Sequence, residues 1–259
     1  MFNFLNLLKA KLVSSRGGKN FAEDLMRFTR WIAEGKNFSL SRFNDGEMMI
    51  INGRFTDLAN KHHGEHTYTP ENEQDERQRY LLHKSLAHQA ENYYVGIACP
   101  CCVGKEMFYG LKEQSKQPET HLTWANIFVN SNFPRFKKHT VPHFSNRRVI
   151  LIANKAADTD GLPFKVETTF SVGSNAWVQD YDRLLGELTQ HIKQHKVENA
   201  LFLFSTGVLS NILIYELNKL FPNNTYLDMG SVFDVELGLG KTRGYLRKGK
   251  RLRQTCVWG

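Results

Sequence analysis

Apolar and polar side chains follow two different periods along this chain, and the first clear one is helical. Over residues 20–35 the apolar positions recur every three or four residues, which predicts an amphipathic helix. Its buried face would carry Phe21, Leu25, Phe28 and Ile32. The period then changes. In SLSRF, residues 39–43, polar and apolar residues alternate singly, as they do in a half-buried strand.

The rest of the chain continues to alternate helical and strand patterns. Two longer stretches predict helices over residues 71–92 and 207–221. Short apolar runs predict the remaining strands, at residues 93–98, 147–154, 200–205 and 226–231. Strands separated by helices favour parallel pairing. We therefore predict the α/β fold class: a single domain with a mostly parallel sheet flanked by helices.

Three segments can be distinguished along the chain. Residues 1–18 form a short amphipathic pattern, which we interpret as a helix docked on the core or lying on a membrane surface. Residues 19–240 form the main domain. Residues 241–259 form a basic tail, which is either solvated or in contact with a partner. Its basic residues are Lys241, Arg243, Arg247, Lys248, Lys250, Arg251 and Arg253.

Composition narrows the class of protein. With 41% hydrophobic and 23% charged residues, the chain can bury a sizeable core. Its formal net charge of +8 favours a polyanionic partner: nucleic acid, anionic lipid or a phosphorylated substrate. No apolar run is long enough to span a membrane, and the N-terminal basic residues follow the apolar part, unlike those of a signal peptide. We expect a cytoplasmic location, or a peripheral one at a membrane.

The four cysteines do not form a disulfide framework. Three of them stand together in CPCC, at Cys99, Cys101 and Cys102, and Cys256 lies near the end of the sequence. This spacing matches no common zinc pattern. We interpret them as reduced thiols at a strand end, with a metal site or a redox pair as the alternatives.

Two carboxylates flank a glycine directly after the first predicted strand. A turn at Gly46 would let Asp45 and Glu47 converge on one point. Such hard oxygen ligands suit Mg²⁺ or Mn²⁺, particularly when the ion also holds a diphosphate. Arg42 would add a fixed positive charge to the same group. The alternative is structural, with Asp45 capping a helix and Glu47 in its first turn.

A second pair of carboxylates, Asp234 and Glu236, follows the last predicted strand and its terminal Asp228. In an extended strand both would lie on one face while Val235 packs away from it. They would then suit a general base, a second metal ligand or a ligand of an acceptor hydroxyl. The alternative is a solvated turn.

Two further turns follow strands and open helices. Gly173 and Asn175 precede one helical pattern that continues to Leu185, and Ser205 and Thr206 precede another. Backbone N–H groups at helix starts favour a phosphate. Neither turn is a P-loop, and the fingerprint GxGxxG is absent, so NAD-linked chemistry is not expected.

The segment over residues 52–70 has no clear period and holds three histidines, His62, His63 and His66. A long loop of this kind is often functional. We consider a metal site at the histidines and, separately, contact of His66 or Tyr68 with substrate. Exposed loop histidines without a role are also common.

Taken together, these stretches resemble the GT-D-type glycosyltransferases, a family first catalogued as a domain of unknown function. SLSRFNDGE is similar to the family signature RFGDGE, and YLDMGSVFDVE is similar to its DIGHxDxE ending. SNAW resembles the NAF segment, and FSTGVLSN stands where the family carries a GPTA turn. The order and spacing agree over roughly residues 20–240, so the main domain resembles a GT-D-like glycosyltransferase domain.

The resemblance implies a Rossmann-like α/β fold and transfer of a sugar from a nucleotide sugar, typically UDP-linked, with a divalent metal. By the resemblance, Asp45 and Glu47 form the metal and diphosphate site. We infer in addition that Asp234 and Glu236 line the acceptor side or supply the base. The remaining donor-side candidates are Arg42, Asn44, Gly173, Asn175, Ser205, Thr206 and Asp228. The acceptor-side candidates are His66, Tyr68 and Arg243.

The chain departs from the family pattern at several positions. Asn44 replaces a glycine, Ser231 stands where the family has histidine, and Phe233 is an additional residue. The donor side is thus better preserved than the acceptor side. We expect a saccharide or other polyanionic acceptor, with a modified base in DNA as an alternative. A non-enzymatic protein that binds nucleic acid or nucleotide sugars and a two-metal phosphoesterase are the rival classes.

Overall fold

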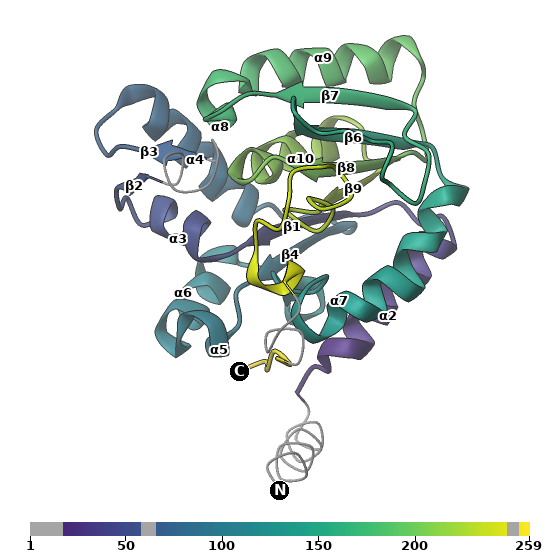
Figure 1. The fold of residues 1–259 in the computed structure, drawn as a ribbon. Helices are drawn as coiled ribbons and strands as arrows, with labels where there is room; N and C mark the ends of the chain where they lie inside the picture. Colours follow the sequence, from purple (N-terminus) through teal and green to yellow (C-terminus); the bar gives the residue numbers. More distant parts are fainter. Residues whose placement is uncertain (1–17, 58–65, 248–253) are drawn as a thin grey trace, which may run out of the picture.

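The computed structural model describes residues 18–57, 66–247 and 254–259, so the predicted N-terminal helix lies almost wholly outside the described residues. A seven-stranded sheet lies between helices, with a two-stranded sheet at the left of Figure 1. All neighbouring strands of the large sheet pair in parallel. The predicted α/β fold class is confirmed. None of the helices in the described residues is long and apolar enough to cross a bilayer.

The strands of the large sheet follow one another in space in an order that differs from the chain order. This spatial order is β5 (Leu122–Trp124), β4 (Tyr93–Ile97), β1 (Ser39–Phe43), β9 (Thr225–Asp228), β8 (Leu201–Ser205), β6 (Val149–Asn154) and β7 (Thr168–Val172). The small sheet pairs β2 (Thr56–Asp57) with β3 (Thr67–Tyr68) in antiparallel fashion.

The helices include the three that the sequence predicts. The α-helices are α2 (Phe21–Ala33), α3 (Asp45–Ile51), α4 (Glu73–Leu86), α5 (Pro100–Val103), α6 (Lys105–Ser115), α7 (Phe133–Arg135), α8 (Ala176–Gln179), α9 (Tyr181–Gln194) and α10 (Val208–Leu220). The other helical segments are η1 (Glu119–His121), η2 (Asn130–Asn132), the π-helical η3 (Phe136–Thr140), η4 (Val141–Asn146) and η5 (Gly244–Leu246).

Strand β1 is buried along its whole length, and the prediction of a half-buried strand is wrong. It lies between β4 and β9, and both of its faces are covered. Its two serines are satisfied from α10: Asn211 Nδ2 donates to Ser41 Oγ at 3.0 Å and Asn218 Nδ2 donates to Ser39 Oγ at 2.9 Å. Polar residues therefore persist in a central strand because a helix supplies their hydrogen bonds.

Two consecutive residues of β4 point to opposite faces of the sheet, and each contacts the helices that cover its face. Tyr93 donates its hydroxyl to the carbonyl of Ser85 in α4 at 2.9 Å, and α10 packs against α4 and α9 in the same layer. Tyr94 points to the other face and meets Phe28 of α2 edge-to-face, with ring centroids 5.7 Å apart. The residues predicted for the buried face of α2 are all at most 3% exposed: Phe21, Leu25, Phe28 and Ile32.

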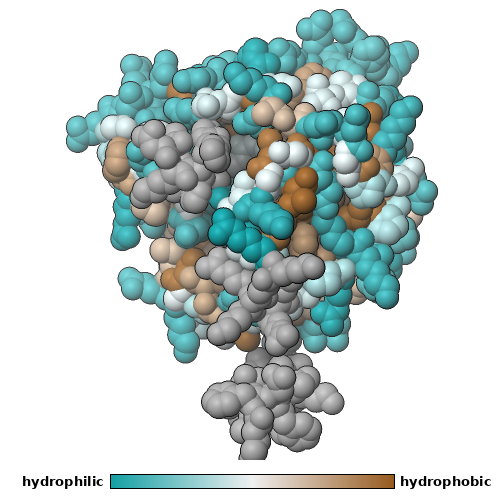
Figure 2. All heavy atoms as spheres, in the orientation of Figure 1, coloured by the Kyte–Doolittle hydropathy of each residue, from teal (hydrophilic) through white to brown (hydrophobic). Residues whose placement is uncertain are grey.

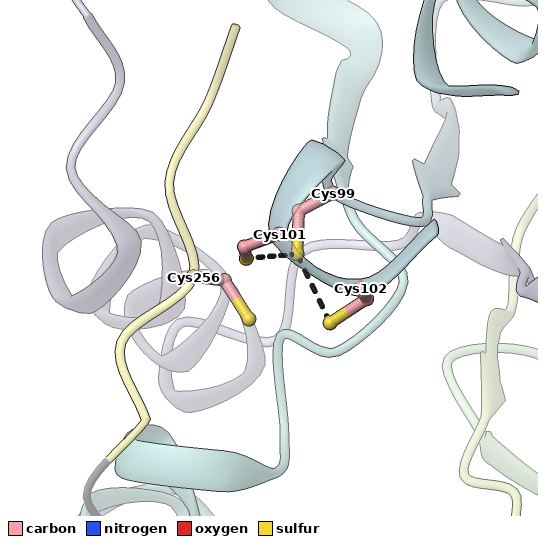
Figure 3. A group of neighbouring side chains, drawn as sticks. All are labelled: Cys99, Cys101, Cys102 and Cys256. Carbon is pink, nitrogen blue, oxygen red and sulfur yellow. Dashed lines mark hydrogen bonds between the residues drawn. The ribbon is translucent and has the colours of Figure 1, made fainter. Parts of the chain in front are cut away.

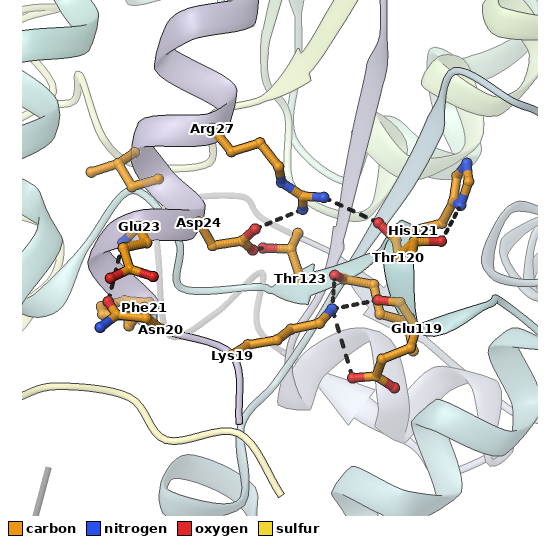
Figure 4. A network of polar contacts seen from close by, with 12 residues as sticks. Lys19, Asn20, Phe21, Glu23, Asp24, Arg27, Glu119, Thr120, His121 and Thr123 are labelled. Atoms are coloured by element: carbon orange, nitrogen blue, oxygen red, sulfur yellow. Dashed lines mark hydrogen bonds and ion pairs between the residues drawn. The ribbon is translucent and has the colours of Figure 1, made fainter. Parts of the chain in front are cut away.

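Polar contacts fix the start of α2 on the edge strand β5 (Figure 4). Asp24 pairs with Arg27 at 2.7 Å and accepts a hydrogen bond from Thr123 Oγ1. Lys19 donates to the carbonyl of Leu122. Burial raises the pKa of Asp24 and lowers the pKa of Lys19 to about 8. The first described residues are therefore anchored to the sheet.

The described parts of the predicted basic tail, residues 241–247 and 254–259, pack against the domain. Trp258 is 9% exposed and meets Trp124 edge-to-face, with ring centroids 4.9 Å apart. Trp124 Nε1 in turn donates to the carbonyl of Val257 at 3.2 Å. A wholly solvated tail is therefore wrong for these residues, because the chain ends in the aromatic core.

Candidate functional site

The carboxyl ends of β1 and β9 mark the point where the order of the sheet reverses. From β1 the chain moves outward to β4 and β5, then builds β6, β7 and β8 on the other side and returns to β1 with β9. In open α/β sheets, ligands bind beyond the carboxyl ends of the strands at such a switch point. Arg42 and Asp228 stand at the ends of these two strands.

Arg42 and Asp228 form a buried ion pair. Arg42 Nη2 lies 3.2 Å from Asp228 Oδ1, and Arg42 Nη1 donates to the carbonyl of Ala125 at 3.0 Å. Burial raises the pKa of Asp228, while Arg42 and the N–H of Gly230 act in the opposite direction. A Cβ on Gly230 would lie 2.6 Å from Arg42 Nη2, and its φ is +52°. The pair thus needs a glycine two residues beyond the strand.

The first predicted carboxylate pair lies at the start of α3, immediately after β1. Asn44 is the N-cap residue, and its N–H donates to Glu47 Oε2 at 2.8 Å, so Glu47 turns back over the helix start. Asp45 is exposed. Burial raises the pKa of Glu47 to about 7. The predicted free convergence of both carboxylates is not found, because Glu47 already binds the backbone, and Asn44 takes the cap position expected for Asp45.

The two carboxylates at this helix start suit a divalent cation whose remaining ligands are waters and phosphate oxygens. Mg²⁺ in such sites is held by one or two carboxylates, with waters and phosphate oxygens completing the shell. Asp45 offers an exposed carboxylate, and Glu47 keeps Oε1 outside its bond to Asn44. Among residues 18–57, 66–247 and 254–259, no group of three or more carboxylates or histidines gathers closely enough to form a ready-made cage.

The predicted phosphate turn at Gly173 and Asn175 is closed by the protein itself. The N–H of Gly173 donates to Asp180 Oδ2 at 2.8 Å, and Asn175 Oδ1 accepts from the N–H of Thr67 at 3.0 Å. The single helix predicted here is also wrong, because α8 ends before Asp180 and α9 begins at Tyr181. The first bond closes the turn onto the end of α8, and the second ties it to β3, so the N–H of Gly173 and Oδ1 of Asn175 are already paired within the protein.

Ser205 and Thr206 lie at the end of β8, as predicted. Thr206 Oγ1 is 2.9 Å from Ser210 Oγ in the first turn of α10. Ser205 Oγ is buried and has no hydrogen-bond partner among the described residues. Ser205 therefore keeps an unused hydroxyl at the ligand-binding edge of the sheet.

His66 lies beside the turn that follows β8. It is 4% exposed, and its Nδ1 is 3.9 Å from the position that a Cβ on Gly207 would take. Its ring meets Trp177 at a centroid distance of 6.3 Å. Neither ring nitrogen has a partner in the described part of the chain. Burial, and then the positive charge of Arg243, lower the pKa of His66 to about 4, so the ring is neutral.

The other candidates in the predicted loop over residues 52–70 are Tyr68, His62 and His63. Tyr68 is fully buried, and its hydroxyl donates to Glu76, so the structure gives it a packing position, while its contact with substrate stays a prediction. Burial raises the pKa of Tyr68 to about 12. His62 and His63 lie outside the described residues.

Asp234 and Glu236 lie in a turn and not in the expected strand. Asp234 is 7% exposed, and its Oδ2 accepts a hydrogen bond from Thr242. Glu236 Oε1 pairs with Lys137 Nζ at 2.8 Å, while its Oε2 is buried without a partner among the described residues. Val235 is 44% exposed, so the expected alternation is wrong. The solvated-turn alternative does not describe Asp234 either.

Residues 241–247 fold back across this turn and bring basic residues to it. Tyr245 Oη is 2.6 Å from Ser231 Oγ, and its ring contacts Phe133 at a centroid distance of 5.3 Å. Arg243 is half-buried and acts electrostatically on His66. In Figure 1 this yellow segment crosses in front of the sheet, and Figure 2 shows hydrophilic side chains gathered in the same place beside a narrow apolar strip.

Several buried polar atoms without partners lie on the residues predicted for the site. Within the described part of the chain these are Arg42 Nε, both ring nitrogens of His66, Ser205 Oγ and Glu236 Oε2. A buried donor or acceptor that stays unpaired costs on the order of 1–3 kcal/mol. Five of the eleven such atoms in the described residues thus lie on candidate site residues, where a polar ligand would pair them.

Two contributors to this edge carry no local sequence signal. Lys137 reaches Glu236 from the π-helical segment η3, and Gly161 approaches the carbonyl of Glu236 so closely that a Cβ would overlap it. Neither is predictable, because both act on a residue far away in the sequence. Gly230 does carry a local signal, since LDMG places a glycine at the end of a predicted strand.

The parallel sheet with its polar switch point has the fold of solved structures of one domain family. Two similar structures are of domain of unknown function 1792, one of them described as having a distinct glycosyltransferase fold. For each the TM-score is 0.53 and the identity 14%, over 83% of this chain and 80% of the other. A third, described as a new glycosyltransferase (DUF1792) from Streptococcus sanguinis, has a TM-score of 0.54 and 14% identity, over 91% and 92%.

This likeness confirms the fold that the sequence motifs predict. At 14% identity it extends to the fold and not to substrate or metal. Comparison with models of protein families gives no match, and comparison with curated proteins gives none either.

Proposed function

We propose that this protein is a metal-dependent glycosyltransferase that moves a sugar from a nucleotide sugar, with UDP as the expected nucleotide, to a saccharide or other polyanionic acceptor. The observation that carries the proposal is the buried Arg42–Asp228 pair at the switch point, followed within three residues by the exposed carboxylate of Asp45. The similarity to structures described as glycosyltransferases supports it.

On the donor side, Asp45 would hold Mn²⁺ or Mg²⁺, with Glu47 Oε1 as a second ligand. When bound, the cation would offset the negative charge that develops on the leaving diphosphate. Arg42 cannot swing toward solvent, because Ala125 and Asp228 fix its guanidinium. It supplies a preorganised positive charge behind the diphosphate.

On the acceptor side, Glu236 is the better candidate for the base. Its Oε2 is buried and without a partner in the described residues, whereas Asp234 already accepts a hydrogen bond from Thr242. Lys137 holds the other oxygen of Glu236 at 2.8 Å and thereby orients the carboxylate. Arg243 and the neutral His66 would contact the acceptor or the transferred sugar.

Release of free UDP from UDP-sugars tests this function. With Mn²⁺ present, the wild-type protein should release UDP, and Asp45→Asn should lower the rate at least about 100-fold, or roughly 2.7 kcal/mol of transition-state stabilisation. Glu73→Gln is the matched control, because Glu73 occupies the same first position of its helix after an asparagine cap. Release of inorganic phosphate, or equal rates in both variants, would contradict the proposal.

A further inference from the structure

All four cysteines of the chain meet at one place, although Cys256 is far from the others in the sequence. Cys99 follows β4, Cys101 and Cys102 lie in α5, and Cys256 arrives with the C-terminal segment (Figure 3). The Sγ atoms of Cys99 and Cys101 are 2.8 Å apart, and those of Cys99 and Cys102 are 3.3 Å apart. All four sulfurs lie within 4.8 Å of one another, and all four thiols are free.

We propose that these four sulfurs bind one structural zinc ion. Four thiolates around zinc at about 2.3 Å form a tetrahedron whose sulfurs are about 3.8 Å apart, which falls inside the range of separations found here. Soft thiolate ligands select zinc over magnesium or manganese. Because four protein ligands close the coordination sphere, the ion would be structural and not catalytic.

Other uses of four clustered thiols fit this geometry less well. A polynuclear iron–sulfur cluster distributes its cysteines over several metal atoms, and their sulfurs would then lie farther apart than the 4.8 Å found here. A disulfide would join only two of the four and would leave the other pair unexplained. A single tetrahedral ion uses all four.

Amide groups around the cluster point toward the sulfurs. Asn126 Nδ2 lies 3.4 Å from Cys102 Sγ, and Asn130 Nδ2 lies 3.5 Å from Cys256 Sγ. Neutral thiols are weak acceptors, whereas metal-bound thiolates regularly accept such hydrogen bonds. These donors come from the segment after β5, so a third part of the chain orients the ligands.

The ion would join the end of β4 to the C-terminus. Closing so long a loop restricts the unfolded chain and stabilises the folded one. The C-terminal segment is also held on η2 and β5: the carbonyl of Gln254 accepts from the N–H of Ser131 at 3.0 Å, and Trp258 packs against Trp124. The ion would therefore anchor residues 254–259, and residues 241–247 of the same tail contact the turn of the candidate site. This proposal is independent of the glycosyltransferase function.

Metal analysis of the full-length protein, purified under reducing conditions without a metal-affinity tag, tests the site. One zinc per chain is expected, and a chelator should lower the melting temperature until zinc is restored. Titration of the metal-free protein with Co²⁺ should saturate at one equivalent, with thiolate-to-cobalt charge transfer and the visible bands of tetrahedral coordination. Zinc should displace the cobalt and abolish these bands.

A ligand variant and its neighbour separate the site from adventitious binding. Cys256→Ser should weaken metal binding more than about 100-fold, because loss of an outer hydrogen-bond partner alone costs about 10–100-fold. Thr255→Ala, which removes a hydroxyl 3.2 Å from Ser131 Oγ in the same segment, should keep full affinity.

Three results would overturn the proposal. The first is a wild-type protein with no cobalt spectrum at one equivalent. The second is a thiol count below four in a separate preparation that is purified and denatured without reductant, which would show a disulfide. The third is an unchanged spectrum in Cys256→Ser. If that variant does not fold, the cobalt titration and thiol count of the wild-type protein decide the question.

Discussion

Arg42 and Asp228 face each other across the two strands at which the sheet reverses its order, with Nη2 and Oδ1 3.2 Å apart. Two buried charges at such a place are stabilised by each other, but they also fix a positive group where a phosphate is expected. Removing one partner would leave an uncompensated buried charge. The more informative changes therefore alter the surroundings of the pair and keep both charges.

Gly230→Ala tests whether the pair depends on close backbone approach. A methyl group at Gly230 would stand 2.6 Å from Arg42 Nη2, and the position has a positive φ of +52°. We expect a loss of about 2–4 kcal/mol in the free energy of unfolding, together with weaker UDP binding. Denaturant titration and calorimetry measure the two effects.

Gly238→Ala is the control for that substitution. Its φ is +72°, but nothing lies within 4 Å of the added Cβ, so it carries only the conformational cost of about 1–2 kcal/mol. UDP affinity should stay at the wild-type value. Equal losses of stability and UDP affinity in both variants would show that the contact with Arg42 is unimportant.

His66 makes stability depend on pH between about 4 and 6.5. Because burial lowers the pKa of His66 to about 4 from an unfolded value of 6.5, the unfolded chain binds a proton first as the pH falls. The stabilisation from the neutral ring is therefore complete above pH 6.5 and is lost progressively toward pH 4, by on the order of 3 kcal/mol.

His66→Gln removes this contribution and leaves the other titrating groups in place. The difference in unfolding free energy between wild type and variant, measured by urea denaturation at pH 7.5 and pH 4.5, should shrink as the pH falls. A difference that stays constant across this range would mean that His66 titrates normally and is not held neutral at the site.

Gly161→Ala should displace the acceptor-side turn. A Cβ at Gly161 would overlap the carbonyl oxygen of Glu236, and its φ is not in the left-handed region, so the clash alone matters. We expect about 1–3 kcal/mol of destabilisation and slower transfer with unchanged UDP affinity. Gly186→Ala in α9, where the added Cβ meets nothing, should instead stabilise by about 0.5–1 kcal/mol. A Gly161→Ala protein as active as wild type would contradict the proposed role of Glu236 as the base.

Periodic patterns predicted helices α2, α4 and α10 and five of the seven strands of the large sheet, because each depends on neighbouring residues, but they did not predict β5, β7 or α6. The apolar face of α2 is an example, from Phe21 to Ile32. The burial of β1 could not be predicted, since its two serines are satisfied by asparagines of α10 far away in the sequence. The alternation of polar and apolar residues therefore predicted a half-buried strand, although both faces of β1 are covered.

The candidate site was predictable in its strand ends and not in its turns. Arg42 and Asp228 follow from the position of each strand, and the structure brings them into contact. The turn of Asp234 and Glu236 has no period, and its shape depends on Lys137 and on residues 241–247. The cysteine cluster depends on the same kind of long-range contact, because spacing alone does not show that Cys256 returns to CPCC.

The most direct test of the account is the affinity of UDP, measured by calorimetry with and without Mn²⁺, for the wild-type protein and for Asp45→Asn. We predict that Mn²⁺ strengthens UDP binding at least about tenfold in the wild type, roughly 1.4 kcal/mol, and that this gain disappears in Asp45→Asn while Glu73→Gln retains it. UDP binding that is independent of Mn²⁺, or a gain that survives in Asp45→Asn, would contradict the assignment of the diphosphate to the start of α3.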